Sequence, residues 1–282
     1  MMLTTRIETL EGGKRLRVAS MGVSAGNAAP VLLLHGYPEN LQIWCELAPR
    51  LATGWNVIAA DWPGMGESDP WPGGATPMHL GERIGVLLNH WKLPRAHIIA
   101  MDMGAQPALA FAAQNPQRVA SLVAMNSLVL WDEDTSWEIS VLRKFGWNRF
   151  ILQNLPRAVF QRAERTFLPH GTRLPAPLRE DFWRCFRQPA VRSTIAKMCA
   201  GYQGTLPRMI DLYKKIVCPT LVLWGENDKH FPVEHARRLH ESIAGSQLQI
   251  VPQGEHWMVW NRAEELSVRI SAFLGALGPL VP

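Results

Sequence analysis

The sequence predicts an α/β fold, with a mostly parallel sheet flanked by helices on both faces and one helical insertion. Three observations predict it. Short apolar runs alternate along the chain with segments of helical periodicity. These runs are apolar throughout, which is typical of strands that are buried on both faces. Between residues 128 and 215 the alternation stops, and prolines punctuate amphipathic segments rich in arginine and tryptophan.

The predicted elements follow one another in a regular order. Before the insertion, strands are expected at 31–34, 56–60, 96–100 and 119–125, and helices at 41–51, 78–90 and 104–115. After it, strands are expected at 219–224 and 247–251, and helices at 233–243 and 263–274. Strands that alternate with helices form a parallel sheet. We therefore expect a core domain made of residues 1–127 and 216–282, and a helical lid made of residues 128–215.

Size and composition indicate an ordinary globular protein. The chain has 282 residues, of which 47% are hydrophobic and 19% are charged, so it can bury a large core. No apolar run approaches the roughly 20 residues of a membrane-spanning helix. Residues 1–8 lack the apolar stretch of a signal peptide. We therefore expect a cytoplasmic protein without a membrane span.

Other functional classes are disfavoured by charge and by motif content. The net charge is +5, and acidic residues are interspersed with the basic ones, so we expect no nucleic-acid binding. The four cysteines are scattered, as reduced thiols usually are. Gly64 and Gly66 follow a strand but lack the third glycine of a dinucleotide loop. His230 and His235 are interpreted as a surface pair and not as metal ligands. We therefore expect neither a cofactor nor a metal.

The most informative residue follows the strand at 96–100. Asp102 stands in the segment Ala100-Met101-Asp102-Met103-Gly104, directly before a helix that has Pro107 in its first turn. Small residues around a central nucleophile are typical of a strained strand-to-helix turn, which lifts the central side chain above the sheet. Aspartate is also a favoured helix N-cap. The motif by itself is therefore compatible with a nucleophile and with a cap.

Two further polar residues also follow predicted strands. Asp228 follows the strand before the last, and His256 follows the last one. Functional groups in open α/β sheets gather at the carboxyl ends of the strands. The chain order of Asp102, Asp228 and His256 is that of a nucleophile, an acid and a base, which favours the nucleophile over the cap. Asp132 and Asp134 are alternatives to Asp228 as the acid.

These segments resemble the α/β-hydrolase superfamily over nearly the whole chain. The resemblance is carried by the turn at Asp102 and by His35-Gly36-Tyr37-Pro38, Asp61-Trp62-Pro63-Gly64-Met65-Gly66-Glu67-Ser68-Asp69, Trp224-Gly225-Glu226-Asn227-Asp228 and Gly254-Glu255-His256-Trp257. Within that superfamily, an aspartate at the nucleophile position is similar to the branch of epoxide hydrolases and dehalogenases. The resemblance implies that the loop containing His35 and Tyr37 forms the oxyanion site.

A carboxylate nucleophile suits reactions at saturated carbon. A serine that attacked such a carbon would leave an ether, whereas a carboxylate leaves an ester that activated water can hydrolyse. In this scheme Asp102 forms an alkyl ester, His256 activates the water, and Asp228 orients the imidazole and stabilises its charged form. The backbone N–H groups of Tyr37 and Met103 would hold the oxyanion.

The loops near the nucleophile favour an epoxide over a halide. Haloalkane dehalogenases are similar to each other in carrying Trp after the nucleophile and Asn in the oxyanion loop, where this chain has Met103 and Tyr37. Fluoroacetate dehalogenases place an arginine near the nucleophile, and the segment 103–106 offers none. Resemblance to the epoxide hydrolases implies proton donors in the lid, which we assign to Tyr202 and, as the second donor, His170.

We therefore predict a cofactor-independent epoxide hydrolase that acts on a small, largely apolar substrate with water. A dehalogenase that uses the same three residues is the alternative. A non-catalytic ligand-binding protein and a diverged esterase are further alternatives. The first has no need of a complete set of nucleophile, acid and base, and the second would have to bypass Asp102.

Overall fold

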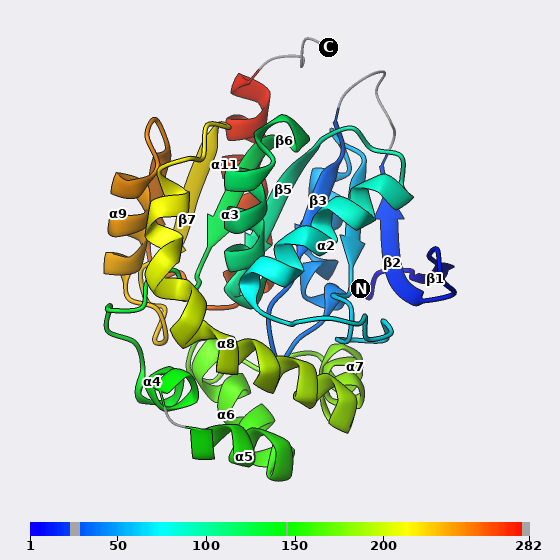
Figure 1. Ribbon diagram of the computed structural model, residues 1–282, viewed down its shortest axis with the longest axis vertical. Coiled ribbons are helices and arrows are strands. Elements are labelled where there is room, and N and C mark those ends of the chain that lie inside the picture. Colours follow the sequence, from blue (N-terminus) through cyan, green and yellow to red (C-terminus); the bar gives the residue numbers. More distant parts are fainter. Residues whose placement is uncertain (23–28, 145, 278–282) are drawn as a thin grey trace.

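The computed structural model describes residues 1–22, 29–144 and 146–277, with the side chains of 144 and 146–148 left out. The described residues form one eight-stranded sheet in the order β1-β2-β4-β3-β5-β6-β7-β8 (Figure 1). The strands are β1 Arg6–Thr9, β2 Arg15–Met21, β3 Val31–Leu34, β4 Val57–Ala60, β5 Ala96–Met101, β6 Val119–Met125, β7 Thr220–Gly225 and β8 Gln247–Val251. Strands β3 to β8 are parallel to one another, and β1 and β2 are antiparallel additions at one edge. The predicted α/β fold with a mostly parallel sheet is confirmed.

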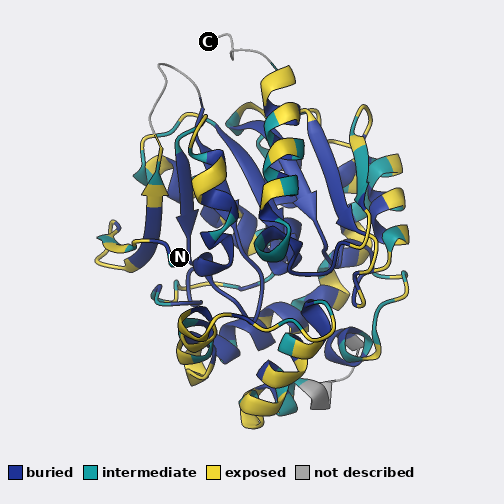
Figure 2. Ribbon diagram, turned by 180° about the vertical axis from the view of Figure 1, so that it is seen from behind, coloured by how far each residue is buried: buried dark blue, intermediate teal, exposed yellow. Residues whose placement is uncertain are grey.

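Helices cover both faces of the sheet. In Figure 1, α2 (Pro77–His90) and α3 (Ala105–Gln114) lie in front of the strands. Helix α11 (Ala263–Ala276) lies on the opposite face, where it packs against α1 (Leu47–Leu51). Figure 2 shows buried strands behind α11, whose outer side is exposed. Two further helices follow β7 and β8, namely α9 (Val233–Ser242) and α10 (Met258–Asn261).

The predicted helix at 41–51 is wrong in one respect, because the structure divides it in two. A 3-10 turn runs from Leu41 to Cys45, and α1 begins at Leu47. The Asn40 side chain caps the turn by accepting a hydrogen bond from the backbone N–H of Gln42 at 2.9 Å. Pro49 has no N–H to continue the hydrogen-bond ladder from the preceding turn. The local sequence therefore favours two short pieces over one helix.

In the described residues between β6 and β7 the chain forms five helices. They are α4 Trp137–Lys144, α5 Gly146–Asn154, α6 Pro156–Phe167, α7 Ala176–Phe186 and α8 Pro189–Tyr213. Figure 1 shows them together beyond the carboxyl ends of the parallel strands. Helix α8 also contacts α2 and α3 of the sheet layer. The division of the chain into a core and a lid at residues 128 and 215 stays a prediction. No helix in the described ranges has the length and apolarity needed to cross a membrane.

Candidate active site

Asp102 lies in a strained turn between β5 and α3. Its φ is +46°, a left-handed conformation that non-glycine residues rarely adopt. The turn is crowded, since a Cβ added to Gly36 would lie 2.4 Å from the Asp102 carboxylate, and one added to Gly104 would lie 2.6 Å from two backbone oxygens. The small residues of the motif therefore allow the close packing that holds this side chain at the end of the sheet.

The Asp102 side chain does not cap the following helix. Met101 and Gly104 occupy the N-cap positions of the 3-10 turn and of α3, and neither makes a side-chain cap. Instead, Asp102 Oδ2 accepts a hydrogen bond from the backbone N–H of Tyr37 at 2.9 Å. The residue Asp102 is only 4% exposed, and its carboxylate faces the loop after β3.

His256 lies between two carboxylates. Its Nδ1 donates to Asp228 Oδ2 at 2.8 Å, and its Nε2 lies 3.9 Å from Asp102 Oδ2. The second distance is too long for a hydrogen bond. Asp228 is itself fixed, because its Oδ1 accepts from the backbone N–H groups of His230 and Phe231. The structure thus brings together the three residues that the sequence predicts as nucleophile, acid and base.

The two alternative acids lie elsewhere. Asp132 pairs with Arg238 at 3.2 Å. The backbone oxygen of Asp134 accepts a hydrogen bond from His235 Nε2 at 3.0 Å. The position predicted for the acid is therefore occupied by Asp228 alone of the three candidates.

Charges in this site shift several pKa values. Burial favours neutral His256, but the Asp228 charge and contacts with both carboxylates outweigh it and raise the pKa of His256 to about 10. Burial also opposes ionisation of Asp228, yet His256 holds the pKa of that carboxyl below its ordinary value. Nearby Glu39 is buried, and burial together with the Asp102 charge raises the pKa of Glu39 to about 7. At neutral pH the resting site therefore holds a protonated His256.

Glu39 is a site residue that the sequence reasoning missed. Its Oε1 accepts a hydrogen bond from Gly36 N at 3.0 Å, and its Oε2 accepts one from Trp257 Nε1 at 3.1 Å. It thereby ties the loop after β3 to the segment that carries His256. The sequence signal that could have identified Glu39 is its position directly after the motif that ends at Pro38.

His35 supports the loop without lining the cavity beside Asp102. Its Nδ1 donates to Gly36 O at 2.7 Å, and its Nε2 accepts from Trp62 N at 3.1 Å. Burial lowers the pKa of His35 to about 4, so the ring is neutral and both nitrogens are used. Met103, in contrast, lines that cavity together with Asp102.

Two cavities adjoin at Tyr37. The first, of about 10 Å³, lies over Asp102, and its wall includes Met103, Cys199 and Tyr202. The second, of about 250 Å³, lies among helices of the 128–215 segment. We call them the Asp102 cavity and the tail cavity. The side chains of Tyr37, Ile139 and Leu142 belong to the walls of both.

The structure places only one of the two predicted lid donors near Asp102. Tyr202 is buried on α8 and lines the Asp102 cavity. His170 is exposed and lies in a separate surface hollow with Arg165 and Arg173. The assignment of His170 is therefore wrong in this structure, because its proline-rich turn faces outward. Tyr37, for which only a backbone role was predicted, is the second tyrosine in the wall.

Arg143 also lines the Asp102 cavity, although it lies far along the chain from the segment 103–106 that follows the nucleophile. Its terminal nitrogens donate to the backbone oxygens of Trp131 at 2.6 Å and Glu133 at 2.7 Å. The guanidinium thus fastens α4 to the chain that precedes it.

The interpretation of His230 and His235 as a surface pair is wrong, since both are buried. His230 Nδ1 lies 2.8 Å from Ser136 Oγ, and its ring lies on the wall of the tail cavity. Burial lowers the pKa of His230 to about 4, so the ring is neutral. Across the described part of the chain, His, Cys, Asp and Glu form no cluster of three or more suited to a metal.

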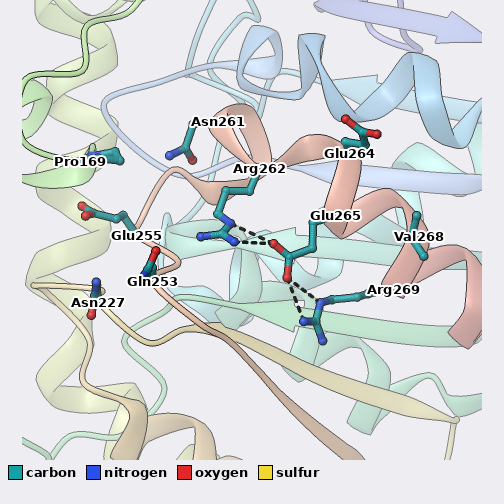
Figure 3. Close-up of a pocket in the computed structure, with 10 residues that line it drawn as sticks. All are labelled: Pro169, Asn227, Gln253, Glu255, Asn261, Arg262, Glu264, Glu265, Val268 and Arg269. Carbon is teal, nitrogen blue, oxygen red and sulfur yellow. Dashed lines mark hydrogen bonds and ion pairs between the residues drawn. The ribbon is translucent and has the colours of Figure 1, made fainter.

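A further hollow of the surface is open and polar, and it lies beside the loops that carry Asp228 and His256. It has a volume of about 1080 Å³ and is lined by Pro169, Asn227, Gln253, Glu255, Asn261, Arg262, Glu264, Glu265, Val268 and Arg269. Figure 3 shows that Arg262 and Arg269 both point toward Glu265, with which they form ion pairs of 2.7 and 2.8 Å. Neither Asp102 nor His256 belongs to its wall.

Comparison with known proteins agrees with this architecture. Residues 29–263 match the model of the family described as alpha/beta hydrolase fold. A 2-hydroxy-6-oxononadienedioate/2-hydroxy-6-oxononatrienedioate hydrolase from Cupriavidus pinatubonensis is 28% identical, with 96% of each chain covered. A putative lipase from Acinetobacter baumannii superimposes with a TM-score of 0.84 at 20% identity, covering 98% of this chain and 92% of the other.

A putative epoxide hydrolase from Pseudomonas aeruginosa has a TM-score of 0.81 at 23% identity, covering 98% of this chain and 99% of the other. At such identity the likeness extends to the fold alone. The Cupriavidus relative is named for a different reaction from the epoxide hydrolase and dehalogenase branch that the sequence predicts. What the comparisons establish is the broader group: the chain belongs to the alpha/beta hydrolase fold family.

Proposed function

We propose that this α/β-fold hydrolase opens an epoxide to a vicinal diol. The observation that carries the proposal is the carboxylate of Asp102 at the strained turn, with His256 Nε2 3.9 Å from its Oδ2. A carboxylate in this position can form an ester with a saturated carbon, and the neighbouring histidine can activate the water that hydrolyses it.

In the first step Asp102 attacks one carbon of the epoxide. The hydrogen bond from Tyr37 N holds Oδ2, which leaves Oδ1 as the attacking oxygen. A bond forms between Oδ1 and the carbon, and the bond between that carbon and the ring oxygen breaks. The ring oxygen receives a proton and becomes a hydroxyl. Attack thus converts the carboxylate into a neutral alkyl ester.

The phenols of Tyr202 and Tyr37 are the proposed proton donors to the ring oxygen. Both residues line the cavity that contains Asp102. Burial and nearby negative charge raise the pKa of each phenol well above its ordinary value. The phenols therefore stay protonated over the working pH range, and a hydrogen bond to the developing alkoxide stabilises the transition state.

In the second step His256 removes a proton from water, and the resulting hydroxide attacks the ester carbonyl. The bond between the carbonyl carbon and Oδ1 breaks, so Oδ1 leaves with the diol and the water oxygen stays on Asp102. Ester formation has removed the Asp102 charge, which is one of the influences that raise the pKa of His256. Alkylation of Asp102 therefore favours the neutral imidazole that this step needs, and the proton that His256 releases replaces the one that the phenol gave to the ring oxygen. The proton that His256 then takes from water restores its resting state.

The reaction named for the Cupriavidus relative concerns a dioate, which carries two carboxylates. The tail cavity supplies one arginine, Arg162, and it is paired with Glu138. In the Asp102 cavity, the terminal nitrogens of Arg143 donate hydrogen bonds to backbone oxygens. These pairings favour a neutral substrate over a doubly charged one.

A haloacid is the second candidate substrate, and Arg143 is the observation that favours it. An arginine beside the nucleophile could bind a substrate carboxylate. The two phenols in the same wall match an epoxide oxygen better than a halide, and the terminal nitrogens of Arg143 are already bonded. Release of halide from haloacetates would identify this activity.

The test is to trap the ester. In a His256→Ala variant treated with an epoxide, mass spectrometry should find the peptide carrying Asp102 heavier by the mass of the epoxide. The wild-type enzyme, turning over in water labelled with heavy oxygen, should incorporate the label into Asp102. An Asp102→Asn variant serves as the control that gives no adduct. If neither epoxides nor halogenated substrates yield the adduct, the alkyl-ester mechanism is wrong.

A further inference from the structure

The tail cavity is lined largely by apolar side chains. Its described lining comes from α4, α5, α6 and the loops after β3 and β7, and its aliphatic and aromatic members include Ile139, Leu142, Ile151, Leu152, Val159, Ala163 and Phe167. Among the polar members, Glu138, Arg162 and Thr166 are engaged with one another, and His230 Nδ1 is paired with Ser136 Oγ. Arg162 Nε donates to Glu138 Oε1 at 2.6 Å, and Thr166 Oγ1 donates to the Arg162 carbonyl at 3.0 Å.

This cavity continues from the site of the proposed reaction. Tyr37, Ile139 and Leu142 have side chains in both cavity walls. A substrate whose reacting carbon lies at Asp102 therefore meets the tail cavity on the other side of Tyr37. The Asp102 cavity itself, at about 10 Å³, holds about one water-sized group, so the rest of a substrate must lie beyond it.

The volume limits the length of chain that fits. An apolar cavity of about 150 Å³ holds a six-carbon ring. By proportion, the tail cavity of about 250 Å³ holds roughly ten carbons. A longer chain would have to extend past the exposed rim residue Trp137.

We propose that the tail cavity binds the unbranched hydrocarbon tail of a terminal epoxide, with space for about ten tail carbons. This inference rests on the proposed function, since Asp102 defines where the reacting carbon lies. The binding energy comes from removing methylene groups from water. The cavity thereby determines the preferred substrate by chain length.

A series of 1,2-epoxyalkanes with tails of two to twelve carbons tests the proposal. We expect kcat/KM to rise roughly fourfold with each added methylene, and to stop rising near ten tail carbons. An Ala163→Phe variant fills the cavity from α6 and should lower kcat/KM at least tenfold for an eight-carbon tail, with less than a twofold change for a two-carbon tail. Ala190→Phe, at an exposed position of α8, is the matched control and should follow the wild type.

Binding of unreactive ligands separates this proposal from the proposed reaction. Linear primary alcohols should bind more tightly as they lengthen, by calorimetry, and Ala163→Phe should abolish that gain. Such a result without epoxide turnover would support the tail cavity and reject the reaction. Turnover of epoxides with the same kcat/KM at every tail length would overturn the tail cavity and leave the reaction standing.

Discussion

Tyr37 contributes two chemically different groups to the site. Its backbone N–H holds Asp102 Oδ2, and its side chain stands in the cavity wall with Tyr202. A substitution by phenylalanine removes the hydroxyl and keeps the N–H. The two contributions can therefore be separated by experiment.

We expect Tyr37→Phe and Tyr202→Phe each to slow epoxide opening by about ten- to a hundredfold, because each removes one hydrogen bond to the developing alkoxide. The measurement is the single-turnover rate of Asp102 alkylation. Tyr213→Phe is the control, since the Tyr213 hydroxyl donates to Val129 O at 2.7 Å, outside both cavities. An unchanged rate in Tyr37→Phe would assign the proton donation to Tyr202 alone.

The positions of Asp102, Asp228 and His256 could be predicted because parallel strands end at one edge of a sheet, so residues after these ends become neighbours. Orientation within loops could not be predicted in the same way. His170 faces outward, while His230 faces inward beneath the helices. His170 and His230 both lie in polar or proline-rich loops. Which face of such a loop becomes buried depends on tertiary packing, and the local sequence does not specify it.

At the scale of elements, α7 is fastened to the sheet layer by a buried ion-pair network. Asp181 on this helix accepts hydrogen bonds from both terminal nitrogens of Arg17 at 3.2 Å and from Asn40 Nδ2 at 2.8 Å. Arg17 in turn lies 3.8 Å from Asp61 and 3.4 Å from Glu67. The network joins a helix of the 128–215 segment to the loops that follow β3 and β4.

We expect Asp181→Asn to lower the free energy of unfolding by about 2 kcal/mol, since buried Arg17 loses a charged hydrogen-bond partner. The freed helix should also be cleaved faster by trypsin, whose target arginines are frequent in residues 128–215. Urea unfolding and timed proteolysis measure the two effects. Glu180→Gln, at the exposed neighbouring position, should change neither. Equal proteolysis of both variants would show that the network does not restrain α7.

Strands and helices with a strong apolar pattern could be predicted from the sequence, whereas strands without such a pattern could not. Strands β3 to β7 and helix α3 follow from largely apolar runs and from Pro107 in the first turn, whereas β8 alternates glutamine with apolar residues. The strands β1 and β2 escaped prediction because charged residues interrupt them, and β1 is largely exposed at the sheet edge. Only pairing with β4 identifies β2 as part of the sheet.

At the scale of the whole molecule, buried histidines shift in opposite directions. Burial lowers the pKa of His35, His97 and His230 to about 4. The neighbouring carboxylates instead raise that of His256 to about 10. Between about pH 4 and 6.5 the folded protein therefore binds fewer protons than the unfolded chain at the first three positions, and between about pH 6.5 and 10 it binds one more at His256.

We expect the free energy of unfolding to fall as the pH rises from 7 to 9. His256 ordinarily titrates near 6.5, so the unfolded chain releases this proton while the folded state keeps it. The stabilisation is complete below pH 6.5 and is lost as the pH rises toward 10, by up to about 1.4 kcal/mol per pH unit. Urea unfolding at several pH values measures the slope. A His256→Asn variant should flatten it, and an equally steep slope there would assign the loss to other groups.

The position of Tyr37 between the two cavities has a stereochemical consequence. Under the proposed reaction, the carboxylate approaches from the side opposite to the breaking C–O bond, so the attacked carbon inverts its configuration. In the proposed complex the oxygen lies toward the phenols of Tyr37 and Tyr202, and the tail extends into the tail cavity. The direction of attack, the position of the oxygen and the direction of the tail together define a chiral binding site. If the proposed reaction holds, we therefore expect the two mirror-image forms of a chiral epoxide to fit unequally and the enzyme to prefer one of them.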